Sequence, residues 1–209
     1  MKLKKGFKRF LYILLSLIAV GLIISYLFFY DTKPVKKVKV LSKIDNYGYE
    51  LSDNKSKEYK ALFKDLEKVL NKKKVNEEDY VNTISKMFIY DFYSLNDKLA
   101  KTDVGGTDFV HNDARRDFLE KAEDTLYKYV ENNLYGARDQ ELPQVKSVEV
   151  EKTETSPFTY KDKVDDNAYT VSVKWDYTDS SFDDYQKSAI LVFVHEDKKL
   201  SLVEIRQGE

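Results

Sequence analysis

The sequence predicts an α+β protein with one N-terminal transmembrane helix, then three helices, then a curved antiparallel sheet of about four strands. Three observations support this class. Phe10 to Tyr30 is a run of 21 residues without a charged side chain. Hydrophobic residues then recur at helical spacing between residues 57 and 132, and at the period of two typical of strands from residue 145 onward. Helices that precede the strands, rather than alternating with them, are typical of an α+β fold.

The apolar run is long enough to cross a bilayer. About 20 helical residues span the roughly 30 Å of hydrocarbon, because a helix rises about 1.5 Å per residue. A cleaved signal peptide would have a shorter apolar region and small residues at its cut. Here the run ends in Tyr26-Leu27-Phe28-Phe29-Tyr30, with no Ala-x-Ala pattern. We therefore expect an uncleaved anchor, residues 10–30, with the lipid bilayer as its partner.

The basic residues around the anchor bear on its orientation. Residues 1–9 form a tail that holds five Lys or Arg, and the first thirteen residues of a juxtamembrane stalk, residues 31–55, hold five lysines. The numbers of Lys and Arg on the two sides of the anchor are thus equal, but those before the helix are more closely spaced. Because basic flanking segments favour the cytoplasm, the denser cluster indicates the cytoplasmic side. We expect a single-pass protein of the plasma membrane with a cytoplasmic N-terminus and an extracytoplasmic domain, residues 56–209.

Composition argues against several kinds of partner and chemistry. Beyond the tail the chain carries 30 basic and 36 acidic residues (35 minus five, against all 36), whereas a nucleic-acid-binding domain would be strongly basic. No nucleic acid is expected. The chain has no Cys, which excludes disulfides, thiol chemistry and a lipoprotein anchor. Lys outnumbers Arg 30 to 5, which is typical of an AT-rich bacterial genome.

The elements follow one another in a simple order. The stalk holds a short alternating stretch at residues 35–41 and a turn-like Asn46-Tyr47-Gly48-Tyr49, so a short strand or hairpin is expected there. Helices are predicted at about 57–72, 77–98 and 113–132. Ser56, Asn76 and Asn112 or Asp113 are suitable N-caps. The second helix is apolar on more than one face, which is typical of a central, buried helix.

Four strands are predicted after Pro143. Alternation over residues 145–150 and 169–177 predicts two half-buried strands, the second one clearer than the first. The continuous apolar run at 189–195 predicts a central strand. Residues 200–205 close the set after a tight turn at 196–199.

One segment of the second helix carries a family resemblance. Glu78-Asp79-Tyr80-Val81 through Phe92-Tyr93 is similar to the aromatic-rich helix that VirB8-type components of secretion and conjugation machines pack into a bent sheet. The order of tail, anchor, stalk, helices and meander also resembles theirs, and the likeness of the folded domain covers about residues 56–206. The likeness rests on pattern and not on a specific motif. It implies the cone-shaped NTF2-like fold and a scaffold without catalytic residues.

Six residues are candidates for contact with a partner or ligand. Gly105-Gly106 does not match a phosphate-binding loop, because the Gly-Lys-Ser/Thr ending is missing. Two adjacent glycines more often mark a positive φ or close backbone packing, and a loop of this kind can also approach a partner. The other candidates follow this loop or lie on the clearest strand: Phe109, His111, Trp175 and Tyr177.

The aromatic residues of the second helix allow two interpretations. Phe88, Phe92 and Tyr93 could line a cavity for a lipid or another apolar ligand, or they could form ordinary core. Core packing is the simpler explanation, and the cavity remains the alternative.

Two further clusters of polar residues could carry chemistry. Asp108 and His111 could transfer protons in an NTF2-like cone, although a helix cap with a surface histidine explains the same residues. Asp176, Asp179, Asp183 and Asp184 are rich in oxygen but lack EF-hand spacing, so a solvated hairpin is favoured over a calcium site. We assign no catalytic residue, no metal ligand and no cofactor, and we do not expect an enzyme.

These observations predict a non-enzymatic scaffold or interaction module in an envelope complex of the secretion or conjugation kind. Its expected partners are other membrane or envelope proteins, or a second copy of the chain. The alternative is a domain that binds a lipid or a small apolar ligand at the membrane surface.

Overall fold

The computed structural model describes residues 5–30 and 38–208. It divides into two units: one holds the helix α1 (Lys5–Tyr30) together with residues 135–137, and the other is the folded domain, whose described residues are 38–134 and 138–208. Within α1, Gly6–Ser25 is long and apolar enough to span a membrane. The exposed apolar side chains of this helix include Tyr12, Leu17 and Leu22. Lys33, Lys36 and Lys37, on which part of the orientation argument rests, lie outside the described residues.

The domain begins with a β-hairpin. Strands β1 (Val40–Ile44) and β2 (Tyr49–Ser52) pair antiparallel, and the N–H groups of Tyr47 and Gly48 donate to the carbonyl of Ile44 to close the turn. Gly48 has φ +66°, which a glycine adopts without steric cost. Ile44, Tyr49 and Leu51 are buried in the main core. The hairpin expected in the stalk therefore packs into the domain.

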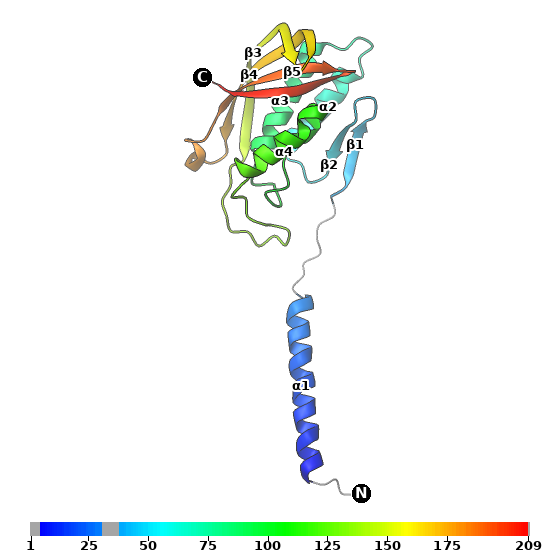
Figure 1. The fold of residues 1–209 in the computed structure, drawn as a ribbon, viewed down its shortest axis with the longest axis vertical. Coiled ribbons are helices and arrows are strands. Elements are labelled where there is room, and N and C mark those ends of the chain that lie inside the picture. The colour runs from blue at the N-terminus through cyan, green and yellow to red at the C-terminus, as the bar shows by residue number, and fades with distance from the viewer. Residues whose placement is uncertain (1–4, 31–37, 209) are drawn as a thin grey trace. The chain divides into compact units, whose positions relative to one another are not determined.

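Two helices follow and form the centre of the domain. Ser56 caps α2 (Lys57–Leu70) by accepting from the N–H of Tyr59, and Asn76 caps α3 (Glu77–Tyr93) by accepting from Glu78 and Asp79. Helix α3 packs against α2 on one side and against strands β3 and β4 on the other (Figure 1). Ten of its residues are buried, which agrees with the central position expected from its apolar faces.

Helix α3 ends five residues earlier than expected, because long-range contacts capture the chain after it. The N–H groups of Leu95 and Asn96 donate to the carbonyl of Pro143. The hydroxyl of Ser94 accepts from the N–H of Val145 at 3.2 Å. These bonds replace the next helical turn.

The third helix of the domain is also shorter than expected. It starts with a 3₁₀ turn at Asn112–Ala114 and continues as α4 (Arg115–Asp124). His111, rather than Asn112 or Asp113, is the cap: its Nδ1 accepts from the N–H of Asp113 at 3.2 Å. The chain leaves the helix at Thr125 and buries Tyr127 completely.

The last four strands form one antiparallel meander in the order β3-β4-β5-β6. Their bounds are β3 (Val145–Tyr160), β4 (Lys163–Tyr177), β5 (Ser188–Glu196) and β6 (Lys199–Gln207). The register shifts at three points between β3 and β4 and at one point between β5 and β6. Such bulges bend a strand and increase its twist. The mixed α+β class with a four-stranded antiparallel sheet is confirmed, with a second, two-stranded sheet besides.

A pair of tyrosines joins the first hairpin to the rest of the core. The hydroxyls of Tyr49 and Tyr80 lie 2.7 Å apart, and the Tyr80 oxygen also accepts from the N–H of Leu200 on β6. Burial raises the pKa of Tyr80 to about 12. The hydroxyl therefore stays protonated and links hairpin, helix and sheet.

Candidate functional site

Gly105 and Gly106 are buried and hold a cluster of charges together. The N–H of Gly106 donates to Oδ2 of Asp91 at 2.9 Å, and the N–H of Gly105 donates to the hydroxyl of Tyr127 at 3.1 Å. Gly106 has φ +75°. A Cβ on Gly105 would lie 2.0 Å from the carbonyl oxygen of Asp91. The glycine pair therefore allows this loop to pack closely against the backbone of α3.

Asp91 lies at the centre of this cluster and receives two ammonium groups. Its Oδ1 is 2.5 Å from Nζ of Lys55 and 2.9 Å from Nζ of Lys98. Burial alone would raise the pKa of Asp91, but the two lysines and the N–H of Gly106 outweigh it and hold the pKa well below its usual range. For Lys98 burial acts to lower the pKa, and Asp91 and Asp97 together reverse this and raise it. The cluster is therefore ionised at neutral pH.

The aromatic residues of α3 pack against one another and against α4. The rings of Phe88 and Phe92 stack at 5.2 Å, and Phe118 lies 5.1 Å from Phe92. Tyr93 contacts Phe92 on one side and Trp175 on the other, with ring centroids 4.4 Å apart in the second pair. Phe88, Phe92 and Tyr93 thus fill the core in this structure, and Phe109 is buried beside Tyr49.

Trp175 and Tyr177 are the buried aromatics at the end of β4. Trp175 is 3% exposed and Tyr177 is 7% exposed, and the Tyr177 hydroxyl donates to the carbonyl of Gln186. Nε1 of Trp175 has no hydrogen-bond partner among the described residues. Trp175 also contributes to a cavity of about 510 Å³, and apart from Val148 its other lining residues are polar or charged, including Lys174, Glu149 and Lys187.

The two histidines occupy different surroundings. Nε2 of His111 lies 3.7 Å from Oε1 of Glu196, and its ring packs on Tyr160 at 5.0 Å. Asp108 is exposed on the preceding turn. The ring of His111 is thus engaged by its capping bond and by Glu196, and Asp108 is not among its hydrogen-bond partners in the described residues.

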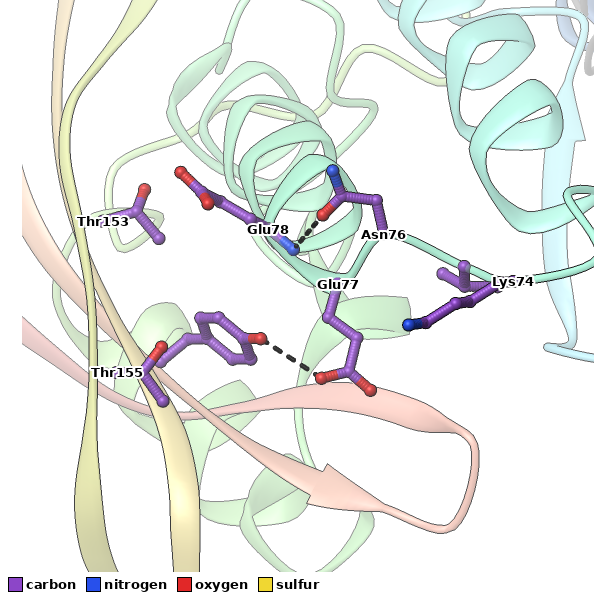
Figure 2. A pocket seen from close by; sticks show the side chains of 8 residues that line it. Lys74, Asn76, Glu77, Glu78, Thr153 and Thr155 are labelled. Atoms are coloured by element: carbon purple, nitrogen blue, oxygen red, sulfur yellow. Dashed lines mark hydrogen bonds between the residues drawn. The ribbon is translucent and has the colours of Figure 1, made fainter.

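His195 joins three elements near the start of α3. Its Nδ1 is 2.9 Å from Oδ2 of Asp165, and its Nε2 is 3.4 Å from Oε2 of Glu77. Figure 2 shows the adjoining cavity, of about 620 Å³, where Tyr169 donates to Glu77 and Asn76 accepts from the N–H of Glu78. Lys74, Val75, Thr153 and Thr155 complete its lining. This is a polar hollow that suits water and ions better than an apolar ligand.

The largest of the cavities described here lies beside β6 and is named the β6 cleft. Its volume is about 860 Å³, within the range of about 300–1,000 Å³ typical of ligand sites. The lining residues come from the loop residue before His111, from the 3₁₀ turn and α4, from the tip of the β3–β4 hairpin and from β6: Val110, Asp113, Ala114, Asp117, Phe118, Glu120, Lys121, Asp124, Tyr160, Lys161, Leu202, Val203, Glu204 and Ile205.

The β6 cleft combines an apolar floor with an acidic rim. Val110 and Leu202 are buried, while Phe118 and Ile205 are only partly buried and pack against the main core. Five carboxylates line the cleft against two lysines. Lys161 bonds to Asp113 at 3.2 Å and holds the pKa of that carboxyl below its usual range. Asp124 has no cation within 4.0 Å in the described part of the chain.

The cleft also exposes an open strand edge. Strand β6 is the last in the sheet, and its outer edge meets one isolated parallel bridge, Val110 to Leu202, where the N–H of His111 donates to the carbonyl of Leu202. After that bond the chain turns away into the 3₁₀ turn. Within residues 38–208, no further strand pairs with Val203–Gln207 on that side. An edge strand of this kind is a template for another extended chain.

Lys161, at the hairpin tip that closes the cleft, has strained backbone. Its φ is +53°, in the left-handed region that a lysine rarely adopts. Such strain persists only where surrounding contacts hold the backbone in place. Here the contacts are the ion pair between Lys161 and Asp113 and the packing of the Tyr160 ring on His111. The tip is thus fixed against the start of the α4 segment.

No pattern in the sequence predicts the β6 cleft. Its walls come from segments about 40 residues apart or more, and no local pattern brings them together. A signal did exist for the ionic cluster: Asp91 is a lone acid within the most apolar stretch of α3, which indicates a buried partner.

Comparison of the chain with protein-family models, with curated proteins and with solved structures found no match.

Proposed function

We propose that this chain is a single-pass bacterial membrane protein whose α+β domain serves outside the cytoplasm as a non-enzymatic interaction module in an envelope complex. The observation that carries the proposal is the β6 cleft, where an open strand edge, partly exposed apolar side chains and a charged rim meet on one face. Strand addition to such an edge gives affinity through backbone hydrogen bonds, and the adjoining side chains give specificity.

The helix α1 supports the membrane part of the proposal. It is long and apolar enough to cross a bilayer, and we propose that it holds the domain at the plasma membrane with the N-terminus in the cytoplasm. Protease digestion of intact spheroplasts tests this orientation. Digestion of the domain before lysis is expected, and a domain that survives until lysis would contradict it.

The NTF2-like and VirB8-type assignment also remains a proposal. It is supported by a helix packed against a bulged antiparallel meander, α3 against β3 and β4, and by the preceding apolar helix. A role in a secretion or conjugation machine would follow from that relationship. An experimental structure of the domain that superposes on an NTF2-like cone is the test of the fold.

The interaction role is tested by affinity purification of the full-length protein from its own membranes after mild crosslinking. Other membrane or envelope proteins are expected to copurify in fixed ratio. A variant with Asp117→Lys and Asp124→Lys reverses two charges of the cleft. This variant should no longer copurify these partner proteins. The control is Asp65→Lys on the exposed surface of α2, and this variant should still copurify the partner proteins. Equal recovery from the cleft variant and the control would count against the proposal.

Binding of a lipid or small apolar ligand is the alternative function. In this structure the aromatic rings proposed to line its pocket contact one another, so ligand entry would require them to separate. Native mass spectrometry of the purified protein distinguishes the two functions. A ligand that stays bound after detergent removal would favour the alternative.

A further inference from the structure

We infer that one end of the folded domain contacts the surface of the bilayer through exposed apolar side chains of two segments. These are residues 38–41, at the start of β1, and the loop 128–134, which follows α4; together they are named the apolar end. The inference rests on the proposed membrane anchor and does not depend on the β6 cleft. It follows from where the exposed apolar side chains gather and from the short distance along the chain between α1 and the domain.

Exposed apolar side chains of the domain are concentrated at the apolar end. Seven large hydrophobic side chains are exposed in residues 38–134 and 138–208. Five of the seven belong to the two segments, with exposed fractions from 39% to 74%: Val38, Val40, Leu41, Tyr129 and Leu134. Single exposed apolar side chains are ordinary, but a gathering of them indicates a contact surface.

The loop 128–134 holds its shape through hydrogen bonds and not through burial of its apolar side chains. The N–H of Asn133 donates to the carbonyl of Leu99 at 2.7 Å. The guanidinium of Arg138 donates to three backbone carbonyls in and around the loop, at 2.8 to 3.2 Å. The backbone is thus held in place while Tyr129 and Leu134 stay exposed, and a loop ordered in advance loses little entropy on binding.

Both segments lie near the C-terminal end of α3. The N–H of Asp53 donates to the carbonyl of Lys39 at 2.8 Å, and Lys55, two residues further on, pairs with Asp91 close to the end of α3. The loop is bonded to Leu99, which follows α3 directly in the fold. Figure 1 shows the start of β1 and the yellow-green loop after α4 at the same end of the domain.

The tip of the β3–β4 hairpin lies at the opposite end of the domain. His195 bonds to Asp165 beside this tip and lies 3.4 Å from Glu77, the first residue of α3. The 17 residues of α3 separate the two ends by about 25 Å, because a helix rises about 1.5 Å per residue. Val164, at the tip, is 64% exposed. It therefore provides a control for an exposed apolar side chain that does not face the bilayer.

The chain between α1 and the domain limits how far the apolar end can be from the bilayer. Helix α1 ends at Tyr30, and the N–H of Lys39 already donates to Oδ1 of Asp53 at 3.1 Å. This separation of nine residues (39 minus 30) spans at most about 30 Å when fully extended. The chain enters the domain at residue 38, within the apolar end. The bilayer surface, where the amphipathic ring of a tyrosine is favourable, is therefore within reach.

Apolar contact, and not charge, favours the bilayer as the partner. Lys39 and Lys128 are accompanied by Glu131 in the two segments, and Asp53 is bonded to Lys39. Mixed charges of this kind give no preference for anionic lipid. The contact should therefore form on zwitterionic phosphatidylcholine and persist at high salt, because salt screens charges but does not weaken the burial of apolar surface.

The absence of Cys from the sequence allows one reporter to be placed at any exposed position. Full-length Leu134→Cys, Val164→Cys and Leu17→Cys are labelled with a nitrobenzoxadiazole dye and reconstituted in phosphatidylcholine vesicles. Some of the lipid carries a quenching spin label, either near the headgroup or deep in the acyl chain. The dye at residue 134 is expected to lose emission to the shallow label, and the dye at residue 17 of α1 to the deep label. The dye at residue 164 should keep its emission with both labels, at low and at high salt.

A second measurement tests whether the two segments contact the bilayer together. The shallow label should also quench a dye at Leu41→Cys. Adding Tyr129→Glu and Leu134→Glu should lower this quenching, because carboxylates oppose entry into an apolar phase. The control, Tyr185→Glu, replaces an exposed aromatic residue outside the apolar end and should leave the quenching unchanged. Fluorescence of Trp175, read before labelling, verifies that each variant is folded.

Three outcomes would overturn the inference. The dyes at residues 134 and 164 could be quenched equally, or quenching at residue 134 could require anionic lipid and disappear at high salt. The dye at residue 17 could be quenched while that at residue 134 is not, which would leave the membrane anchor standing and remove only the contact of the apolar end. Absence of quenching at residue 17 would contradict the anchor itself, and the inference with it.

Discussion

The hydroxyl of Tyr127 donates a hydrogen bond to the carbonyl of Phe92 at 2.7 Å and accepts one from the N–H of Gly105 at 3.1 Å. One buried side chain thus satisfies two backbone groups from the end of α3 and the loop after it. Tyr127→Phe should lower the free energy of unfolding by about 3 kcal/mol, because both groups lose their partner in a buried environment. Urea unfolding followed by Trp175 fluorescence measures it, since Trp175 is the single tryptophan.

The matched control is Tyr129→Phe, two residues further on. Tyr129 is 74% exposed, so the loss of its hydroxyl should change the free energy of unfolding by less than about 0.5 kcal/mol. Equal effects of the two substitutions would show that the hydroxyl of Tyr127 does not hold the loop in place.

Gly105→Ala should destabilise the domain by about 3 kcal/mol, since the new methyl group overlaps the backbone of Asp91 and the loop must move. Gly136→Ala is the control: it has φ +68° but open space around it, so only the backbone cost of about 1 kcal/mol is expected. The two midpoints of thermal unfolding, measured side by side, distinguish steric overlap from backbone strain. A larger effect at Gly136 would contradict the packing assigned to Gly105.

Lys98→Met should lower the free energy of unfolding by about 3 kcal/mol, because it leaves the buried Asp91 and the partly buried Asp97 with one cation fewer. Lys68→Met breaks an exposed pair with Asp65 and should change it by less than about 0.5 kcal/mol. The double variant Asp91→Asn, Lys98→Met should lose less than the sum of the single changes, since the two residues interact directly. Strict additivity would show that they do not.

The sequence predicted the elements of the domain well where the signal is local. The stripe of α3 and the alternation around Trp175 both mark the correct element, because burial of one face imposes a period on the residues. The ends are set by distant partners. Ser94 leaves the helix to meet Val145, and β3 continues to Tyr160, where alternation has faded, because β4 pairs with it along that length.

The candidate site depends even more on distant partners. Tyr160 reaches His111, and Phe118 and Ile205 line one cleft, although each residue looks ordinary in its own segment. A long hairpin that returns to the start of the α4 segment brings them together. Contacts of this separation leave no periodic trace in the chain, so the β6 cleft becomes visible only in the folded domain.

Acid should destabilise the domain partly through Asp91. Its folded pKa lies below the value of about 3.9 that an unfolded aspartate has, so the folded state gains stability from this carboxylate above about pH 4. That contribution is lost progressively as the pH falls below about 5, because the unfolded state then binds the proton and the folded state does not. Lys98, with a raised pKa, keeps its charge throughout this range and loses its contribution only in strong alkali.

The neighbour Asp97 acts in the opposite direction. Burial raises its pKa and the charge of Lys98 only partly offsets this, so its ionisation above about pH 4 opposes folding. The change in stability of the wild type at low pH therefore has contributions from Asp91, from Asp97 and from carboxylates on the surface. When the free energy of unfolding of wild type is compared with that of Asp91→Asn, the contributions of the carboxylates that both proteins share cancel.

We expect Asp91→Asn to be less stable than wild type by about 3 kcal/mol at pH 7, because the buried Lys98 and the partly buried Lys55 lose this carboxylate. This difference should shrink steadily between about pH 5 and pH 3, since the wild type alone loses the contribution of Asp91 there. Urea midpoints at several pH values, read from Trp175, measure it. Asp65→Asn, on the exposed surface of α2, should show a small difference that stays flat with pH. A difference for Asp91→Asn that is equally flat would contradict a carboxylate held ionised by Lys55 and Lys98.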